Sequence, residues 1–242
     1  MKRAALKEKH VRKITQWRLF NMQIPIAYIS FPEVKLHQHY GHKLRGYFGN
    51  LFMEKSPLLH NHYDDGRLRY KYPLVQYKIV KGVPMLVGLA EGADLLLDLF
   101  LDIKTLQLGE LTVNVYSKNI KRELYEPKIL SSDYYKYRFM SLWMALNQNN
   151  YKRYLEFTDG PEIMMFLSKI LIGNVLSFYK GIGFTADEKI QVLSLVVPKS
   201  TMFKNKKMVA FTGDFYCNAW LPDYIGIGKS VSRGFGTLVS IG

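Results

Sequence analysis

Histidines are concentrated in one part of this chain. Five of the six lie between positions 37 and 62, at His37, His39, His42, His60 and His62. An imidazole changes protonation near pH 6.5, so it can accept or donate a proton in a reaction at neutral pH. The same residues could hold zinc or manganese, since Asp64 and Asp65 follow the second His-x-His pair. Because no cysteine pair or series of spaced carboxylates accompanies them, we predict that no metal is bound.

A second unusual segment lies near the C-terminus. Residues 226–236 read Gly-Ile-Gly-Lys-Ser-Val-Ser-Arg-Gly-Phe-Gly, which places two Gly-x-Gly pairs around a basic core. Glycines let backbone N–H groups approach an anion, and lysine and arginine add positive charge at the same place. The spacing is not that of a P-loop. A plain glycine-rich hairpin is the alternative to an anion-binding loop built from Gly226, Gly228, Lys229, Arg233, Gly234 and Gly236.

The composition indicates a polyanionic partner. The chain has 242 residues, with 34 Lys and Arg against 20 Asp and Glu, for a net charge of +14. Such a charge points to nucleic acid or to an anionic membrane surface. The 17 tyrosines and 14 phenylalanines favour nucleic acid, because bases stack on aromatic rings. The 48% hydrophobic content excludes a disordered chain.

The sequence also bears on the cellular compartment. Cys217 is the single cysteine, so the chain can form no internal disulfide, as is typical of a reducing cytoplasm. The charged N-terminus lacks the apolar core of a secretory signal. The most apolar stretch, 163–178, is expected to be too short to span a membrane. We therefore expect a cytoplasmic protein without a membrane partner.

Hydrophobic patterns predict six elements in the first half, in the order β-α-β-β-α-β of a ferredoxin-like domain. They are a strand at 17–31, a helix at 38–55, strands at 72–81 and 84–90, a helix at 91–101 and a strand at 111–117.

The second half follows a similar but less complete pattern. The predicted elements are a strand at 134–146, a helix at 160–178, and strands at 190–197, 209–219 and 235–241. No second helix is evident, 147–150 is predicted as a turn, and 199–207 is predicted as a basic loop. We expect an α+β protein with two tandem ferredoxin-like (RRM-like) domains. The predicted organisation is a basic arm at 1–13 and domains at 14–122 and 123–242.

The glycine-rich segment supports a family resemblance. Gly-apolar-Gly, a short basic insert and a second Gly-apolar-Gly near the C-terminus resemble the glycine-rich loop of the RAMP superfamily. The most similar group is the CRISPR repeat-processing endoribonucleases, whose first helix resembles His42-Lys-Leu-Arg-Gly-Tyr-Phe-Gly-Asn-Leu-Phe52. The resemblance implies two tandem ferredoxin-like domains. It also implies cleavage of CRISPR precursor transcripts within each repeat, without metal or cofactor, leaving a 2′,3′-cyclic phosphate.

The resemblance also implies site residues. The segment 58–71 is similar to members in which the catalytic histidine follows the first helix and precedes two acidic residues and a glycine. It assigns catalysis to His62, with His60 beside it and Tyr47 on the helix. Two histidines instead of one, and Tyr63 before the acids, depart from that pattern. The implied RNA-binding residues are those of the glycine-rich loop together with Lys43, Arg45, Arg67 and Arg69, while Lys71 is a further candidate cation.

Three alternatives stay open. His37, His39 and His42 form a rival set, either as an RNA-contact face that includes a second catalytic histidine or as a solvated helix face. The chain could be a non-catalytic RAMP subunit that binds crRNA, or a basic metal-dependent nuclease. The expected partner is CRISPR repeat RNA, and other effector subunits or a second copy of the chain are further candidates.

Overall fold

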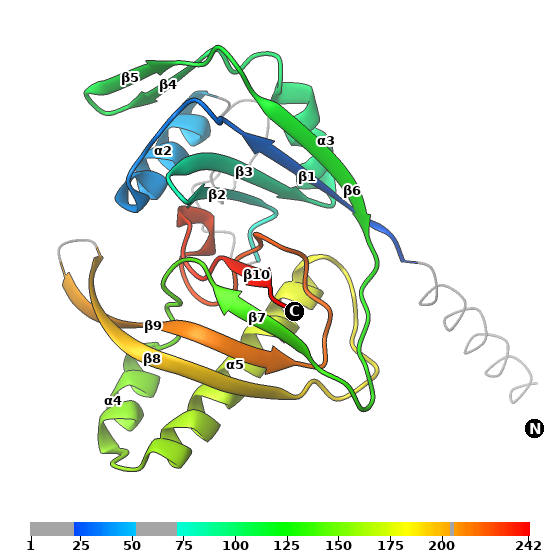
Figure 1. The fold of residues 1–242 in the computed structure, drawn as a ribbon, viewed down its shortest axis with the longest axis vertical. Helices are drawn as coiled ribbons and strands as arrows, with labels where there is room; N and C mark the ends of the chain where they lie inside the picture. Colours follow the sequence, from blue (N-terminus) through cyan, green and yellow to red (C-terminus); the bar gives the residue numbers. More distant parts are fainter. Residues whose placement is uncertain (1–21, 52–71, 204–205) are drawn as a thin grey trace, which may run out of the picture.

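The protein is an α+β molecule with two four-stranded antiparallel sheets (Figure 1). A computed structural model describes residues 22–51, 72–203 and 206–242. The predicted basic arm, His60, His62, Arg67, Arg69 and Lys71 lie outside the described residues. Figure 1 shows the N-terminal unit above the C-terminal unit, with the last residues of the chain between them.

The N-terminal unit has ferredoxin-like topology, as predicted. Its sheet has the order β2-β3-β1-β6, with antiparallel neighbours throughout. The elements in chain order are β1 (Ile24–Ser30), η1 (Gln38–Tyr40), α2 (Gly41–Leu51), β2 (Val75–Val80), β3 (Val83–Leu89), α3 (Glu91–Leu99), a hairpin of β4 (Thr105–Leu108) and β5 (Leu111–Asn114), and β6 (Asn119–Tyr125).

Both faces of this sheet are largely buried at β1, β2 and β3. Ile29 and Tyr77 belong to a cluster on one face that includes buried leucines of α2 and α3. Ile26 and Tyr28 belong to a second cluster, on the opposite face, which extends into the C-terminal unit. A strand buried on both faces reads as a continuous apolar run, which explains why β1 shows no alternation. The second cluster joins the two units into one packed body.

The C-terminal unit repeats this topology with one helix replaced. Its sheet has the order β10-β7-β9-β8, which matches β6-β1-β3-β2 position by position. Its elements are β7 (Tyr135–Phe139), α4 (Gln148–Glu156), α5 (Gly160–Gly181), β8 (Val192–Phe203), β9 (Lys206–Cys217), η3 (Val231–Arg233) and β10 (Leu238–Ser240). Residues 218–237, which contain the glycine-rich segment, stand where a second helix would lie.

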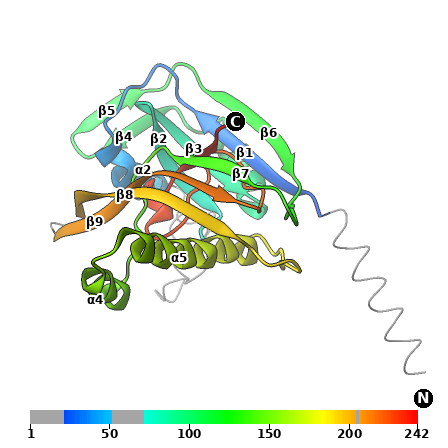
Figure 2. The ribbon, with the colours of Figure 1, turned by 60° about the horizontal axis from the view of Figure 1, so that its bottom comes forward.

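Helix α5 supports this second sheet. Figure 2 shows it lying along β8 and β9, and its residues Leu171, Val175 and Phe178 are fully buried. At 22 residues, α5 is long and apolar enough to cross a membrane by length and composition. The prediction that this stretch is too short to span a membrane was therefore wrong. Core helices meet the same criterion, and the packing of α5 against β8 is that of a core helix.

One strand of the first half was assigned wrongly. Residues 111–117 do not supply the fourth strand of the sheet, because β5 pairs with β4 in a separate hairpin. The fourth strand is β6, which pairs with β1 from Asn119 to Tyr125. It is an edge strand with mostly exposed side chains, so it lacks the apolar pattern used to find strands. Helix 38–55 was predicted correctly in its described part, where a 3-10 turn leads into α2.

Three predictions for the second half were also wrong. The segment 199–207 is not a basic loop, since β8 and β9 stay paired up to Phe203 and Lys206. The polar residues there belong to the exposed end of a long hairpin. The strand predicted at 134–146 ends at Phe139, and the following residues turn toward the glycine-rich segment. The predicted turn at 147–150 is the start of α4, where the Asn147 side chain caps the Asn150 N–H at 2.7 Å.

We propose that the two units divide between β6 and β7, within residues 126–134. The division predicted after residue 122 would fall inside β6, which pairs with β1 as far as Tyr125.

We expect Leu171→Ala to lower the free energy of unfolding by about 2–5 kcal/mol, because it leaves a cavity beneath β8. Leu176 on the same helix is 44% exposed, and Leu176→Ala should cost less than about 1 kcal/mol. Urea denaturation of the two variants measures the difference. Equal losses would contradict the assignment of α5 as a core helix.

Candidate active site

The glycine-rich loop, residues 226–236, is a tightly closed structure between β9 and β10. The Ile227 N–H donates to the Gly236 carbonyl at 3.0 Å, and Gly226 forms a bridge with Thr237. A Cβ on Gly236 would lie 1.9 Å from the Ile227 carbonyl oxygen, so glycine is required there. Gly234, at a φ of +89°, ends the 3-10 turn η3 in the left-handed region. The loop therefore depends on its glycines for shape.

Buried polar side chains of the N-terminal unit hold one side of this loop. The Gly226 N–H donates to Gln76 Oε1 at 2.9 Å, and the Tyr72 hydroxyl donates to the Gly226 carbonyl at 2.6 Å. Gln76 and Lys78 alternate with Tyr77 along β2, so their side chains leave the sheet on the face toward the loop. Both are fully buried. These residues were missed from the sequence, because single polar residues in a strand usually face solvent.

The segment that follows β7 holds the other side of the loop. The Gly236 N–H donates to the Leu142 carbonyl at 2.9 Å, and the Lys229 N–H donates to the Met144 carbonyl at 3.0 Å. The Ser141 hydroxyl donates to the Gly234 carbonyl at 2.6 Å. The loop is thus fixed between the sheet of one unit and the chain of the other.

The structure brings two predicted RNA-binding residues together. Arg233 ends η3, and its carbonyl lies 2.6 Å from the position of a Cβ on Gly41, the first residue of α2. Arg45 lies one turn further along α2, and burial together with the charge of Arg233 lowers its pKa. Two guanidinium groups close enough to perturb each other create a local field that an anion relieves. A phosphate is the natural anion for such a pair.

Lys229 lies on the other side of the loop. Its ammonium donates to the Leu146 carbonyl at 3.0 Å, and burial lowers its pKa. This side borders a groove of about 710 Å³ between α4 and α5, which also contains Arg153 and Lys169. The predicted cations of the loop therefore face two different surfaces.

A histidine pair lies at the start of α2, next to the loop. His37 caps the 3-10 turn η1, and its Nδ1 lies 2.8 Å from Nδ1 of His39. The His39 ring stacks on Tyr40, with 4.4 Å between centroids, and the Lys43 ammonium lies 4.8 Å from the Tyr40 centroid. Partial desolvation and the charge of His37 lower the pKa of His39. The two Nδ1 atoms are within hydrogen-bond distance, so one ring can serve as a proton acceptor and the other as a proton donor.

Residues adjacent to this histidine pair in the chain contact the C-terminal unit. Gln38, between the two histidines, donates to the Met140 carbonyl at 3.3 Å, and Gly41 abuts Arg233. Two histidines of the rival set thus lie close in the chain to Gly41, which abuts the predicted anion site.

Tyr47, predicted as a catalytic residue, has a different environment. Its hydroxyl donates to the Thr105 carbonyl at 2.9 Å, on β4, and its ring packs on Phe48. Tyr40 is the tyrosine in contact with the histidine pair, and its position was not singled out from the sequence. The catalytic assignment of Tyr47 stays a prediction.

The remaining candidate histidines, His60 and His62, lie in 52–71, outside the described residues. Tyr72, the first described residue after them, contacts Gly226. Within the described ranges, no three His, Cys, Asp or Glu residues are grouped as a metal-ligand set. The predicted absence of a metal stays a prediction.

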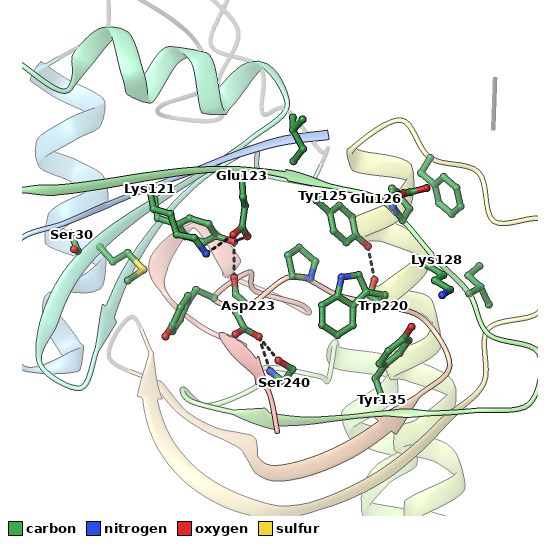
Figure 3. A pocket seen from close by; sticks show the side chains of 18 of the residues that line it. Ser30, Lys121, Glu123, Tyr125, Glu126, Lys128, Tyr135, Trp220, Asp223 and Ser240 are labelled. Carbon is green, nitrogen blue, oxygen red and sulfur yellow. Dashed lines mark hydrogen bonds and ion pairs between the residues drawn. The ribbon is translucent and has the colours of Figure 1, made fainter. Parts of the chain in front are cut away.

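A separate cleft of about 1130 Å³ lies between the units along β1 and β6 (Figure 3). Its wall carries aromatic rings, such as Tyr135 and Trp220 at 4.8 Å between centroids. Several of its charged side chains have partners within the wall, since Lys121 binds Glu123, and Asp223 accepts from the Ser240 N–H at 2.7 Å. The histidine pair does not line this cleft. We therefore place the candidate active site at the junction of α2 and the glycine-rich loop.

Comparison with known proteins agrees with this architecture. Family models described as "Cas6b N-terminal domain" and "Cas6b C-terminal domain" match residues 22–126 and 129–241. The fold is similar to a structure titled "Crystal structure of Cas6b", at 36% identity and a TM-score of 0.85, covering 91% of this chain and all of that one. A structure titled "Crystal structure of CRISPR RNA processing endoribonuclease Cas6b" matches at 33% identity and a TM-score of 0.73, with the same coverage.

A curated protein of Methanocaldococcus jannaschii, "Uncharacterized protein MJ0978", is 35% identical over 147 residues, which cover 55% of this chain and 99% of that protein. A type IV Cas6 crRNA endonuclease shares the fold at 13% identity and a TM-score of 0.59. The predicted RAMP resemblance is confirmed by the two domain matches and by the shared fold over nearly the whole described chain. The chain belongs to the Cas6b family.

Proposed function

We propose that this protein is an endoribonuclease that binds CRISPR repeat RNA and cleaves the precursor crRNA within each repeat. Membership of the Cas6b family supports the substrate class, because a similar structure is titled a CRISPR RNA processing endoribonuclease. One observation carries the chemistry: the His37–His39 pair, with 2.8 Å between Nδ1 atoms, lies just before Gly41, which abuts the Arg233 carbonyl of the cationic glycine-rich loop.

The proposed reaction needs no metal. The ribose 2′-oxygen attacks the adjacent phosphorus, the bond from phosphorus to the 5′-oxygen breaks, and a 2′,3′-cyclic phosphate remains. One imidazole takes the proton of the 2′-hydroxyl, and an acid supplies a proton to the leaving 5′-oxygen. We assign the base to His39, because partial desolvation and the charge of His37 lower its pKa and so favour the neutral imidazole. Arg45 and Arg233 would stabilise the charge that develops on the phosphate.

The competing proposal is the sequence-based assignment of catalysis to His60 and His62. In it Tyr47 assists, and Arg67 or Arg69 is the cation. The contacts of the described residues support His37 and His39 instead, and Lys43 beside Tyr40 would add positive charge there. A non-catalytic RAMP subunit is the second functional candidate. Other effector subunits and a second copy of the chain stay proposals as partners.

We expect the purified protein to cut an RNA repeat in EDTA and to leave intact a repeat with a 2′-deoxy substitution at the scissile position. The reason is that the 2′-oxygen is the nucleophile and no metal activates it. Gel analysis of end-labelled RNA measures both. Loss of cutting in EDTA would indicate a metal-dependent nuclease, and tight binding without any cutting would indicate a non-catalytic subunit.

We expect His37→Ala and His39→Ala each to slow single-turnover cleavage by about 10²–10⁴-fold, the usual contribution of general acid–base catalysis. In NMR titration, His39 should titrate below pH 6.5, and His37→Ala should raise its pKa by removing a neighbouring positive charge. His60→Ala and His62→Ala are the matched controls. A full rate in the first two variants, with loss in the controls, would assign the proton transfer to His60 or His62.

We expect Arg233→Gln to weaken binding of uncleavable repeat RNA and to reduce the slope of log K against log salt concentration by about 1, because one phosphate contact is lost. Arg122→Gln is the control, since Arg122 lies on β6 and pairs with Asp94. Filter binding between low and moderate salt measures the slopes. An unchanged slope for Arg233→Gln would argue against a phosphate contact at this residue.

A further inference from the structure

Lys78 is an unusual residue in this structure. Among the residues that the structure describes, it is the one charged side chain that is fully buried. It lies on β2, and its side chain leaves the sheet on the face opposite Tyr77, toward the C-terminal unit. Burial alone lowers the pKa of its ammonium to about 7. A lysine in this position is costly to bury, and an apolar side chain of the same length would fill the space.

The ammonium of Lys78 sits against the glycine-rich loop. Nζ donates to the carbonyl of Val231, the first residue of η3, at 3.4 Å. A Cβ on Gly226 would lie 2.6 Å from Nζ, so the absence of a side chain at Gly226 makes room for the ammonium. The Val231 carbonyl also accepts the Gly234 N–H at 3.1 Å, the bond that closes the turn. Lys78 therefore contacts one of the two backbone oxygens that accept the hydrogen bonds of η3.

This contact lies next to the candidate active site. Two residues after Val231, Arg233 ends the turn, and its carbonyl abuts Gly41 at the start of α2. Gly41 follows the histidine pair and Tyr40 in the chain. The orientation of η3 thus sets where the guanidinium of Arg233 lies relative to the histidines. Because Lys78 comes from the N-terminal sheet, it links that sheet to a loop about 150 residues away in sequence.

We propose that Lys78 is a positioning residue. From β2, it holds η3 in place so that Arg233 faces the phosphate next to the histidine pair. This rests on the proposed endoribonuclease function. Lys78 itself does not touch RNA, since it is fully buried. Its contribution is to the geometry of the loop, through the contact of Nζ with the Val231 carbonyl.

The test compares Lys78→Met with Lys118→Met. Methionine has a similar length and no charge, so Lys78→Met should keep the thermal midpoint of unfolding unchanged or higher. Lys118 is the matched control, because its ammonium donates to the carbonyls of Phe100 and Ile103, in the N-terminal unit and away from the loop. Single-turnover cleavage of repeat RNA, binding of its 2′-deoxy analogue and amide hydrogen exchange are measured for both.

We expect Lys78→Met to slow cleavage at saturating RNA by about tenfold or more, the usual effect of losing one charged hydrogen bond. Exchange of the Arg233 and Gly234 amides should accelerate by a similar factor, since the N–H groups of both residues close η3. Lys118→Met should leave cleavage and these amides unchanged. A normal cleavage rate, normal exchange in η3, or a Lys78→Met protein that does not fold would each overturn the proposal.

The exchange measurement keeps this proposal separate from the proposed function. If the wild-type protein cuts no repeat RNA, the endoribonuclease proposal fails. Faster exchange in Lys78→Met would then still establish that Lys78 holds η3, and unchanged exchange would refute that as well.

Discussion

Polar groups that are buried between the two units limit where the glycine-rich loop can lie. Gln76 accepts a hydrogen bond from the Gly226 N–H, and the Tyr72 hydroxyl donates one to the Gly226 carbonyl. Gln76 is fully buried on the face of the N-terminal sheet toward the loop. A buried polar group left without a partner costs free energy, so moving the loop away from β2 would leave several groups unpaired at once. The loop is thereby held in one position relative to a sheet that precedes it by about 150 residues.

The candidate active site inherits its geometry from this arrangement. The first residue of α2, Gly41, lies against the last residue of η3, Arg233. This close approach is possible because Gly41 has no side chain to separate the helix from the Arg233 carbonyl. The same helix supplies Arg45, and the turn before it supplies the histidine pair. Positive charge from both units and the candidate proton-transfer groups of the N-terminal unit thus meet at one junction. The guanidinium groups of Arg45 and Arg233 repel each other, and an RNA phosphate would offset that repulsion.

Much of the fold follows from local patterns. The order of the elements in the N-terminal unit and the start of α5 at Gly160, one residue before Pro161, were predictable, because apolar periodicity and helix-start signals are local. The second helix of the C-terminal unit, α4, was missed, because its polar residues are not buried and carry little apolar periodicity. The failures have a common cause. β6 and the outer part of the β8–β9 hairpin are exposed and polar, and what makes them strands is pairing with a partner strand. Such pairing leaves little trace in the pattern of an edge strand.

The sequence alone establishes three features: the basic glycine-rich segment, the concentration of histidines and the family resemblance. Each of these depends only on residue type and short spacing. Which histidines meet the loop, and that a strand lysine lies buried beneath it, depend on contacts between distant segments. The sequence left open whether His37 and His39 form an RNA-contact face or a solvated one, and the three-dimensional structure places them just before Gly41, which abuts Arg233. A pattern along one chain cannot reveal such a neighbourhood, because burial and proximity are properties of how the two units pack together.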